Sequence, residues 1–182
     1  MAWKVFGSRA ARLEDPALLR GAGRFVDDLV FPEMLHAAFV RCPHPHAAIK
    51  GVDKSAALAV PGVRAVLTLA DLRPLLARER LVVGLPSSSY KQDLNRPALA
   101  GDEAVYVGEP VAAVIADSRY VAEDAASLVA VDYDPLPAVA DCRDALAPGA
   151  PTVHRASPHN LLAEFAMGYG DIDAARAGAR AA

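Results

Sequence analysis

The stretch AVYVGEPVAAVIADSRYVAEDAASLVA, residues 104–130, carries the clearest structural signals of the chain. Two valine-rich apolar runs, at 104–107 and 111–116, flank a Gly-Glu-Pro turn and predict two strands. The second run is apolar at every position, which is typical of a strand covered on both faces. We therefore expect residues 111–116 to lie at the centre of a sheet.

A helix is predicted directly after this strand, over 119–130. Ser118 is a residue type that commonly caps a helix N-terminus, and acidic residues follow in the first turns, where the helix dipole favours them. Apolar residues at spacings i, i+4, i+7 and i+8 form one stripe along the helix. The stripe consists of Val121, Ala125, Leu128 and Val129.

Outward from this stretch, adjacent strands outnumber helices, which indicates an α+β fold. Short apolar runs closed by turn residues predict strands at 35–41, 47–52, 63–68 and 129–133. A short helix is expected from Asp53 or Ser55 to Val60, and another over 141–146. Breakers and polar residues predict a long surface loop at 81–101.

Three regions differ in composition. Residues 1–34 are rich in turn formers and charges and predict an extended arm, whereas 35–150 carry the periodic apolar runs of a folded domain. Residues 151–182 are polar and predict an irregular tail, whose last dozen residues suit a helix in composition but have no apolar face.

Composition excludes several classes of function. The chain has 182 residues with 19 basic and 22 acidic side chains, so it lacks the basic surface that nucleic-acid binding needs. No stretch reaches the roughly 18 apolar residues of a membrane span, and no signal peptide is recognised. The two cysteines, Cys42 and Cys142, are too few for a disulfide framework, which indicates a cytoplasmic protein.

Cys42, His44 and His46 form the one cluster of soft metal ligands in the sequence. On an extended strand, alternate positions would point all three the same way, as a metal site requires. No second pair follows at a zinc-finger spacing, and His154 and His159 could join only through the fold. A strand end with packed or exposed histidines is the favoured reading, and a small metal-binding protein ranks last among the hypotheses.

Paired carboxylates, glycine pairs and serines elsewhere match no complete catalytic or phosphate-binding frame. From the residues alone we therefore assign no catalytic, cofactor-binding or metal-binding residue.

Several segments together resemble a known family. They are RLEDP at 12–16, GAGRFVDD at 21–28, MLHAAFVR at 34–41, VYVGEPVAAVIA at 105–116, YVAEDAA at 120–126 and VDYDPLP at 131–137. In this order and spacing they are similar to the start of the large, molybdopterin-binding subunit of molybdenum hydroxylases. That family includes xanthine dehydrogenase, aldehyde oxidase and aerobic carbon monoxide dehydrogenase.

The resemblance implies that 35–150 form an α/β hammerhead domain after an extended arm, and that the irregular tail begins a missing cofactor-binding region. This region supplies no catalytic or metal residue in the family, whose glycine-rich cofactor segment and catalytic glutamate lie further along. The implied function is a structural or assembly portion of an oxidoreductase, not catalytic by itself. The alternative is a stand-alone non-catalytic interaction module or a truncated gene product.

For the whole complex the resemblance implies a molybdenum–pterin cofactor in the rest of the large subunit, with 2Fe–2S clusters and FAD on partner subunits. An ordered polar arm on a small domain needs a surface to offset its lost entropy. The candidate contact residues are Arg12, Glu14, Asp15, Gly108 and Glu109. The alternative left open is that residues 14–16 only start a short helix and Gly108 only turns a strand.

Overall fold

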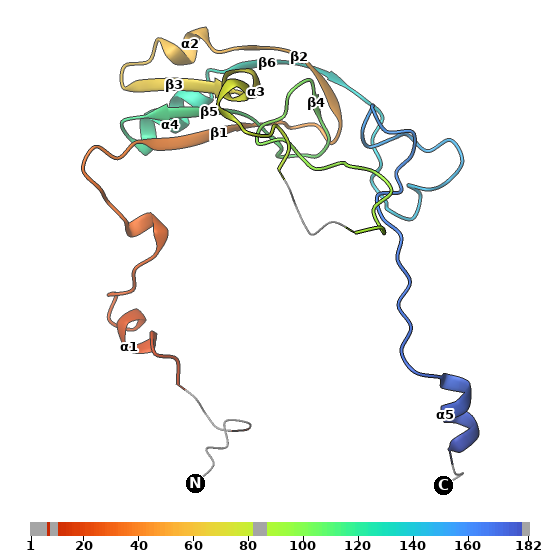
Figure 1. Cartoon of the computed structure of the whole chain (residues 1–182). Coiled ribbons are helices and arrows are strands. Elements are labelled where there is room, and N and C mark those ends of the chain that lie inside the picture. The colour runs from red at the N-terminus through yellow and green to blue at the C-terminus, as the bar shows by residue number, and fades with distance from the viewer. Residues whose placement is uncertain (1–6, 8–10, 82–86, 180–182) are drawn as a thin grey trace. The chain divides into compact units, whose positions relative to one another are not determined.

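The computed structural model describes residues 7, 11–81 and 87–179 (Figure 1). The chain divides into two compact units, 1–34 and 35–182, and each is described by itself. The second unit contains two three-stranded sheets and several helices.

The first sheet has the strand order β1-β5-β3, and both pairings are antiparallel. Its strands are β1 (His36–Arg41), β5 (Pro110–Ala116) and β3 (Val63–Thr68), which lie side by side in Figure 1. Most of β5 is buried, which confirms the prediction of a central strand. The predicted α+β class is confirmed as well.

Helix α4 (Arg119–Ala126) packs against β1 and β5. It begins as predicted, because the Ser118 Oγ accepts a hydrogen bond from the Val121 N–H at 3.2 Å. Its predicted end was wrong. The Ser127 hydroxyl donates to the Asp124 carbonyl at 2.6 Å at the end of the helix, and the chain turns into the next strand. Leu128 therefore lies outside the buried stripe and is 47% exposed.

The second sheet has the order β4-β2-β6, again antiparallel. Its strands are β4 (Glu103–Ala104), β2 (Ala47–Asp53) and β6 (Ala130–Pro135). The strand predicted at 104–107 was wrong beyond Ala104, because the following residues form a turn instead of continuing the ladder.

The remaining helices of the second unit are short. They are α2 (Ser55–Leu58), α3 (Leu69–Leu72), the 3-10 helix Arg73–Leu75 and α5 (Ile172–Gly178). The helix predicted over 141–146 was wrong: this segment forms successive turns, and the Asp141 carboxylate accepts a hydrogen bond from the Arg143 N–H at 2.9 Å. Among the described residues, no helix is long and apolar enough to cross a membrane.

Two hydrophobic clusters stabilise the unit, and β5 contributes to both through its opposite faces. One contains Cys42, Ala47, Ala100, Ala104 and Val111, and the other contains Ala57, Val66, Val114, Ala125 and Val129. Val52 and Val131 pack against both clusters. The two sheets are thereby joined by continuous apolar packing.

The unit 1–34 contains α1 (Asp15–Leu18) and a 3-10 helix, Val26–Asp28. None of its described residues is buried, and large apolar side chains such as Leu13, Leu19 and Val26 are more than four-fifths exposed. By itself this unit has no hydrophobic core among its described residues.

Candidate functional site

The turn between β4 and β5 is held from within by Glu109. Its side chain is 4% exposed, and its Oε2 accepts a hydrogen bond from the Val105 N–H at 2.6 Å. Burial raises the pKa of the Glu109 carboxyl, while backbone hydrogen bonds from Val105 and Tyr106 act in the opposite direction. Glu109 therefore points into the unit and fixes the shape of the turn.

A glycine is favoured at position 108 because of its backbone conformation, and not because a side chain would clash with a neighbour. Its φ is +87°, in the left-handed region, and nothing lies within 4 Å of the position a Cβ would take. Its N–H donates to the Cys42 carbonyl at 2.7 Å, and its carbonyl accepts from the Arg41 guanidinium at 2.8 Å. The turn is thereby fastened to the end of β1.

The three candidate residues in the arm are surface groups at the start of α1. The Arg12 Nε donates to the Asp15 carboxylate at 3.3 Å; the Arg12 side chain is largely exposed and that of Asp15 is about half exposed. Glu14 is exposed and makes no side-chain capping bond to the helix. Residues 14–16 do start a short helix, and the contact of these residues with a partner stays a prediction.

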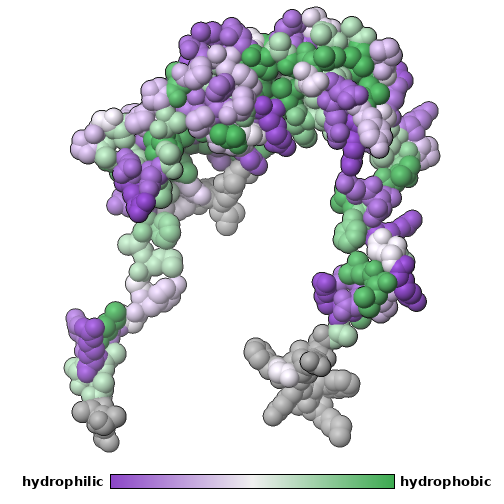
Figure 2. Space-filling model, turned by 180° about the vertical axis from the view of Figure 1, so that it is seen from behind, coloured by the Kyte–Doolittle hydropathy of each residue, from purple (hydrophilic) through white to green (hydrophobic). Residues whose placement is uncertain are grey.

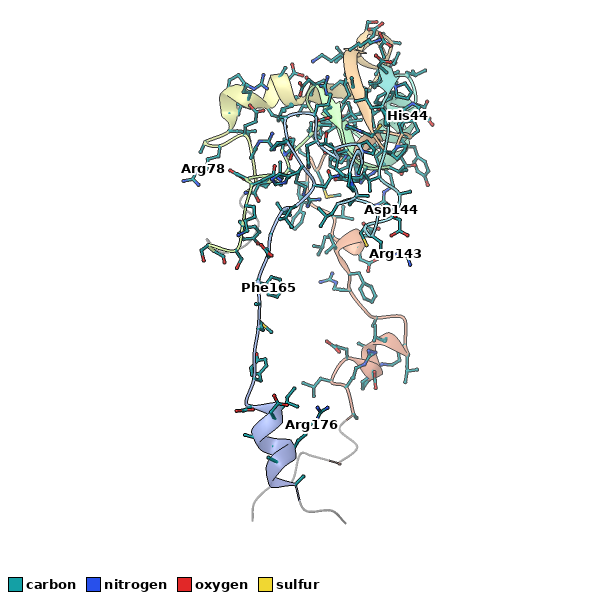
Figure 3. The ribbon with its side chains drawn as sticks, turned by 90° about the vertical axis from the view of Figure 1, so that its right-hand side faces the viewer. His44, Arg78, Arg143, Asp144, Phe165 and Arg176 are labelled. Atoms are coloured by element: carbon teal, nitrogen blue, oxygen red, sulfur yellow. The ribbon has the colours of Figure 1, made fainter. Side chains whose placement is uncertain are left out.

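The structure does not bring Cys42, His44 and His46 to one point. Cys42 is 1% exposed, and its Sγ accepts a hydrogen bond from the His44 N–H at 3.4 Å. The His44 ring, labelled in Figure 3, packs edge-on against Tyr133 with centroids 5.3 Å apart. The premise of one extended strand fails, because β1 ends at Arg41 and the chain then bends.

Tyr133 has an unusual environment beside this cysteine. Among the described residues, its hydroxyl is the one buried side-chain oxygen or nitrogen with no hydrogen-bond partner. Burial, and then the neighbouring Cys42 thiol, raise the pKa of the phenol, so it stays protonated. A buried unpaired hydroxyl destabilises a fold modestly, and we find no chemical use for this one.

A polar network absent from the sequence predictions joins distant segments. The Glu103 Oε1 lies 2.9 Å from the His46 Nε2 and accepts the Arg155 N–H at 2.9 Å. The other ring nitrogen of His46 lies 2.7 Å from the Pro137 carbonyl, and His46 is 4% exposed. Burial lowers the pKa of the adjacent His154, and the charge of Glu103 opposes that shift.

A second set of polar contacts fastens the loop before β4 to the tail. The Gln92 Nε2 donates to the carbonyls of His159 and Leu161, each at 2.8 Å, and the Ser157 hydroxyl donates to the Gln92 Oε1. We call Gln92, Glu103, Arg155 and Ser157 the polar seam.

The sequence does not predict the polar seam. Its partners lie 52 residues apart for Glu103 and Arg155 and 69 apart for Gln92 and Leu161. Except for Glu103 in β4, the side chains of the polar seam lie in irregular segments, which have no periodicity that would pair them.

The outer face of the first sheet carries apolar residues. Antiparallel pairing places Phe39 and Leu67 opposite Ala113, on the face away from α4. Phe39 is 48% exposed, and the Arg41 guanidinium lies 5.5 Å from the centre of its ring. Figure 2 shows hydrophobic residues at the surface of this unit beside hydrophilic ones.

An open depression on the second sheet is lined by Gly51, Val52, Asp53, Ala130, Val131 and Asp132. This depression does not fit a molybdenum–pterin cofactor. A pterin and its phosphate need a closer cradle of hydrogen-bond donors than this surface supplies. Within the described ranges, no group of three or more His, Cys, Asp or Glu is placed to hold a metal ion.

Comparison with known proteins identifies the fold. Residues 20–137 match the family described as "Aldehyde oxidase and xanthine dehydrogenase, a/b hammerhead domain". In solved structures, the chain is similar to the aldehyde oxidoreductase of Desulfovibrio desulfuricans, with a TM-score of 0.75 and 32% identity over 85% of this chain and 17% of that one. It is also similar to the CO dehydrogenase of Oligotropha carboxidovorans, with a TM-score of 0.67 and 43% identity over 80% of this chain and 17% of that one.

Among curated proteins, the nicotine 6-hydroxylase large subunit of Paenarthrobacter nicotinovorans is 38% identical over 94% of this chain and 20% of its own length. The carbon monoxide dehydrogenase large chain of Hydrogenophaga pseudoflava is 43% identical over 80% of this chain and 17% of its own.

This chain belongs to the aldehyde oxidase and xanthine dehydrogenase a/b hammerhead domain family. It spans about a fifth of the length of these relatives, so it corresponds to a small part of a molybdenum hydroxylase large subunit. The resemblance and the hammerhead fold predicted from the sequence are confirmed.

Proposed function

We propose that the chain is a non-catalytic assembly portion of a molybdenum hydroxylase large subunit, which docks onto the cofactor-bearing remainder of that subunit. The observation that carries the proposal is the coverage. Large subunits align with 80–94% of this chain at 38–43% identity, while the chain covers only 17–20% of them. The chemistry then belongs to the much longer part outside this match.

The surface supports docking. On the second unit, Phe39, Tyr106 and Val107 are 48, 38 and 62% exposed, although all three are large apolar or aromatic side chains. Aromatic side chains such as Phe39 and Tyr106 are typical of interface cores. Since Glu109 points inward, its proposed role at such an interface is to hold Gly108 and the exposed turn in position. Arg12, Glu14 and Asp15 are proposed to contact the same partner from the arm.

The full complex is proposed to carry the molybdenum–pterin cofactor in the remainder of the large subunit, and 2Fe–2S clusters and FAD on partner subunits. Oxidoreductase activity then belongs to the complex, which we place in the cytoplasm. When bound there, the molybdenum cofactor would supply the substrate oxidation chemistry. The residues of this chain would stabilise the assembly.

The proposal is tested by purifying a tagged chain from its native host and identifying bound polypeptides by mass spectrometry. We expect the remainder of a large subunit and the iron–sulfur and flavin subunits to copurify. Phe39→Asp should reduce their recovery, whereas Asp132→Asn, on the other sheet, should not. Recovery of the wild-type chain alone would instead support the stand-alone interaction module.

A further inference from the structure

Residues 165–169, Phe-Ala-Met-Gly-Tyr, alternate large apolar residues with small ones. Phe165, Met167 and Tyr169 are 73, 70 and 84% exposed. Figure 3 shows Phe165 on an extended segment. In extended chain, side chains two apart share a face, so these three large side chains form one apolar face. The pattern is that of a strand with one buried side.

Backbone hydrogen bonds hold the chain in place immediately before residues 165–169. The Lys91 N–H donates to the Leu162 carbonyl at 2.9 Å, and the Glu164 N–H donates to the Ser89 carbonyl at 2.9 Å, on either side of an antiparallel bridge. The backbone is therefore already held in strand geometry at residue 164. This ordering reduces the entropy lost when the following residues bind.

The next residues have no partner of their own in the described part of the chain. No hydrogen bond joins the backbone of 165–170 to another described residue, whereas extended backbone inside a protein pairs its N–H and carbonyl groups with a neighbouring strand. The nicotine 6-hydroxylase and carbon monoxide dehydrogenase large subunits are about five times as long as this chain, so most of each large subunit lies outside the match.

From this we infer that residues 165–169 add as a strand to an open sheet edge in the cofactor-bearing remainder of the large subunit. Phe165, Met167 and Tyr169 face the apolar core of that sheet, and Ala166 and Gly168 face the other way. The inference rests on the proposed function and specifies where and how the chain docks.

A second copy of this chain is the less suitable occupant. Burying these three side chains removes roughly 500 Å² per chain from water, judged from the area that large side chains cover. A stable complex of separate proteins buries about 800 Å² per partner. A strand of five residues is therefore too small to hold a dimer alone, but it can add to the other docking surfaces of one assembly.

The test compares two substitutions at neighbouring positions on opposite faces, in the tagged full chain produced in the native host. Met167→Ser should lower recovery of the large-subunit remainder about tenfold or more, because it removes buried apolar area. Ala166→Ser, the matched control, should leave recovery unchanged. Both side chains lie outside the hydrophobic clusters, so the melting temperature of the free chain should not change.

Hydrogen exchange supplies a readout of the backbone pairing itself. Amides of 165–169 should exchange fast in the free chain and slowly in the complex, and Met167→Pro should remove this protection. Equal partner recovery with Met167→Ser and wild type would overturn the strand inference and leave the proposed function standing. Recovery of no partner with the wild type would overturn both. Dimers of the free chain that Met167→Ser dissolves would overturn the choice of partner.

Discussion

The sheet β1-β5-β3 under α4 and the polar seam are held by different forces. In the first, Val114 is 0% exposed and packs with Val66 and Ala125, so the burial of apolar side chains stabilises the sheet. In the second, Glu103 of β4 and Gln92 of the loop before β4 form hydrogen bonds to the irregular segment after β6. We expect a destabilising substitution in the sheet to unfold the whole unit. A substitution in the polar seam should detach mainly the tail, residues 151–182.

The largest effect is expected from Val114→Asp. A carboxylate at this buried position has no partner, and the substitution should destabilise the unit by more than ~4 kcal/mol, enough to prevent folding. Circular dichroism during urea unfolding measures this. Val107→Asp is the control, because Val107 is 62% exposed and should tolerate the charge. An unfolding curve for Val114→Asp that matches wild type would show that the first sheet is not the stabilising core of the unit.

A smaller, more local effect is expected from Glu103→Ala. It removes the acceptor shared by His46 and Arg155 and should cost about 2 kcal/mol, since a buried polar group loses its partner. Hydrogen exchange should increase at 153–164 before it increases in β5. Glu123→Ala, on the exposed side of α4, is the matched control. Uniform loosening of both regions would show that the seam and the sheet form one cooperative unit.

Loss of a helix cap should have a smaller effect again. Ser118→Ala deletes the acceptor of the Val121 N–H and should cost about 1 kcal/mol. Ser118→Asn keeps a capping oxygen and should recover most of that stability in thermal unfolding. Equal stability of the alanine and asparagine variants would mean that the cap contributes nothing to α4.

The smallest expected effect depends on pH. Hydrogen bonds from Lys54, and then from the backbone and hydroxyl of Thr68, lower the pKa of Asp71 to about 2 from its ordinary value of 3.8. A lowered pKa in the folded state means that the charged carboxylate stabilises the fold above about pH 4. This contribution is lost as pH falls through about 2.

Asp71→Asn serves as the reference for this pH dependence. The difference in free energy of unfolding between wild type and Asp71→Asn should shrink as pH is lowered from 4 to 2. A difference that stays constant over that range would show that the pKa of Asp71 is not lowered in the folded state.

The same contrast explains what the sequence could predict. The run of apolar residues at 111–116 and the cap at Ser118 depend on neighbouring positions, so periodicity and capping chemistry located β5 and the start of α4. The end of α4 was wrong because Leu128 continues the apolar spacing after Ser127 has already ended the helix. Periodicity alone does not include this competition from a side-chain hydrogen bond.

The candidate site was predicted less well than the fold. Cys42, His44 and His46 suggested one face because they alternate, but alternation has that meaning only within a strand, and β1 ends at Arg41. Glu109 was predicted to contact a partner, but its side chain points inward, and this direction depends on the amide of Val105 in a turn that no pattern specifies. Contacts between residues more than 50 apart, such as Glu103 with Arg155, exist only once the chain has folded.

We propose that this hammerhead unit serves as part of a molybdenum hydroxylase. The most direct measurement is elemental analysis of molybdenum and iron in the complex purified gently from the native host through this chain. We expect molybdenum near one atom per chain, together with iron from the partner subunits. A preparation in which the chain is intact but carries neither metal nor any partner polypeptide would contradict the proposal.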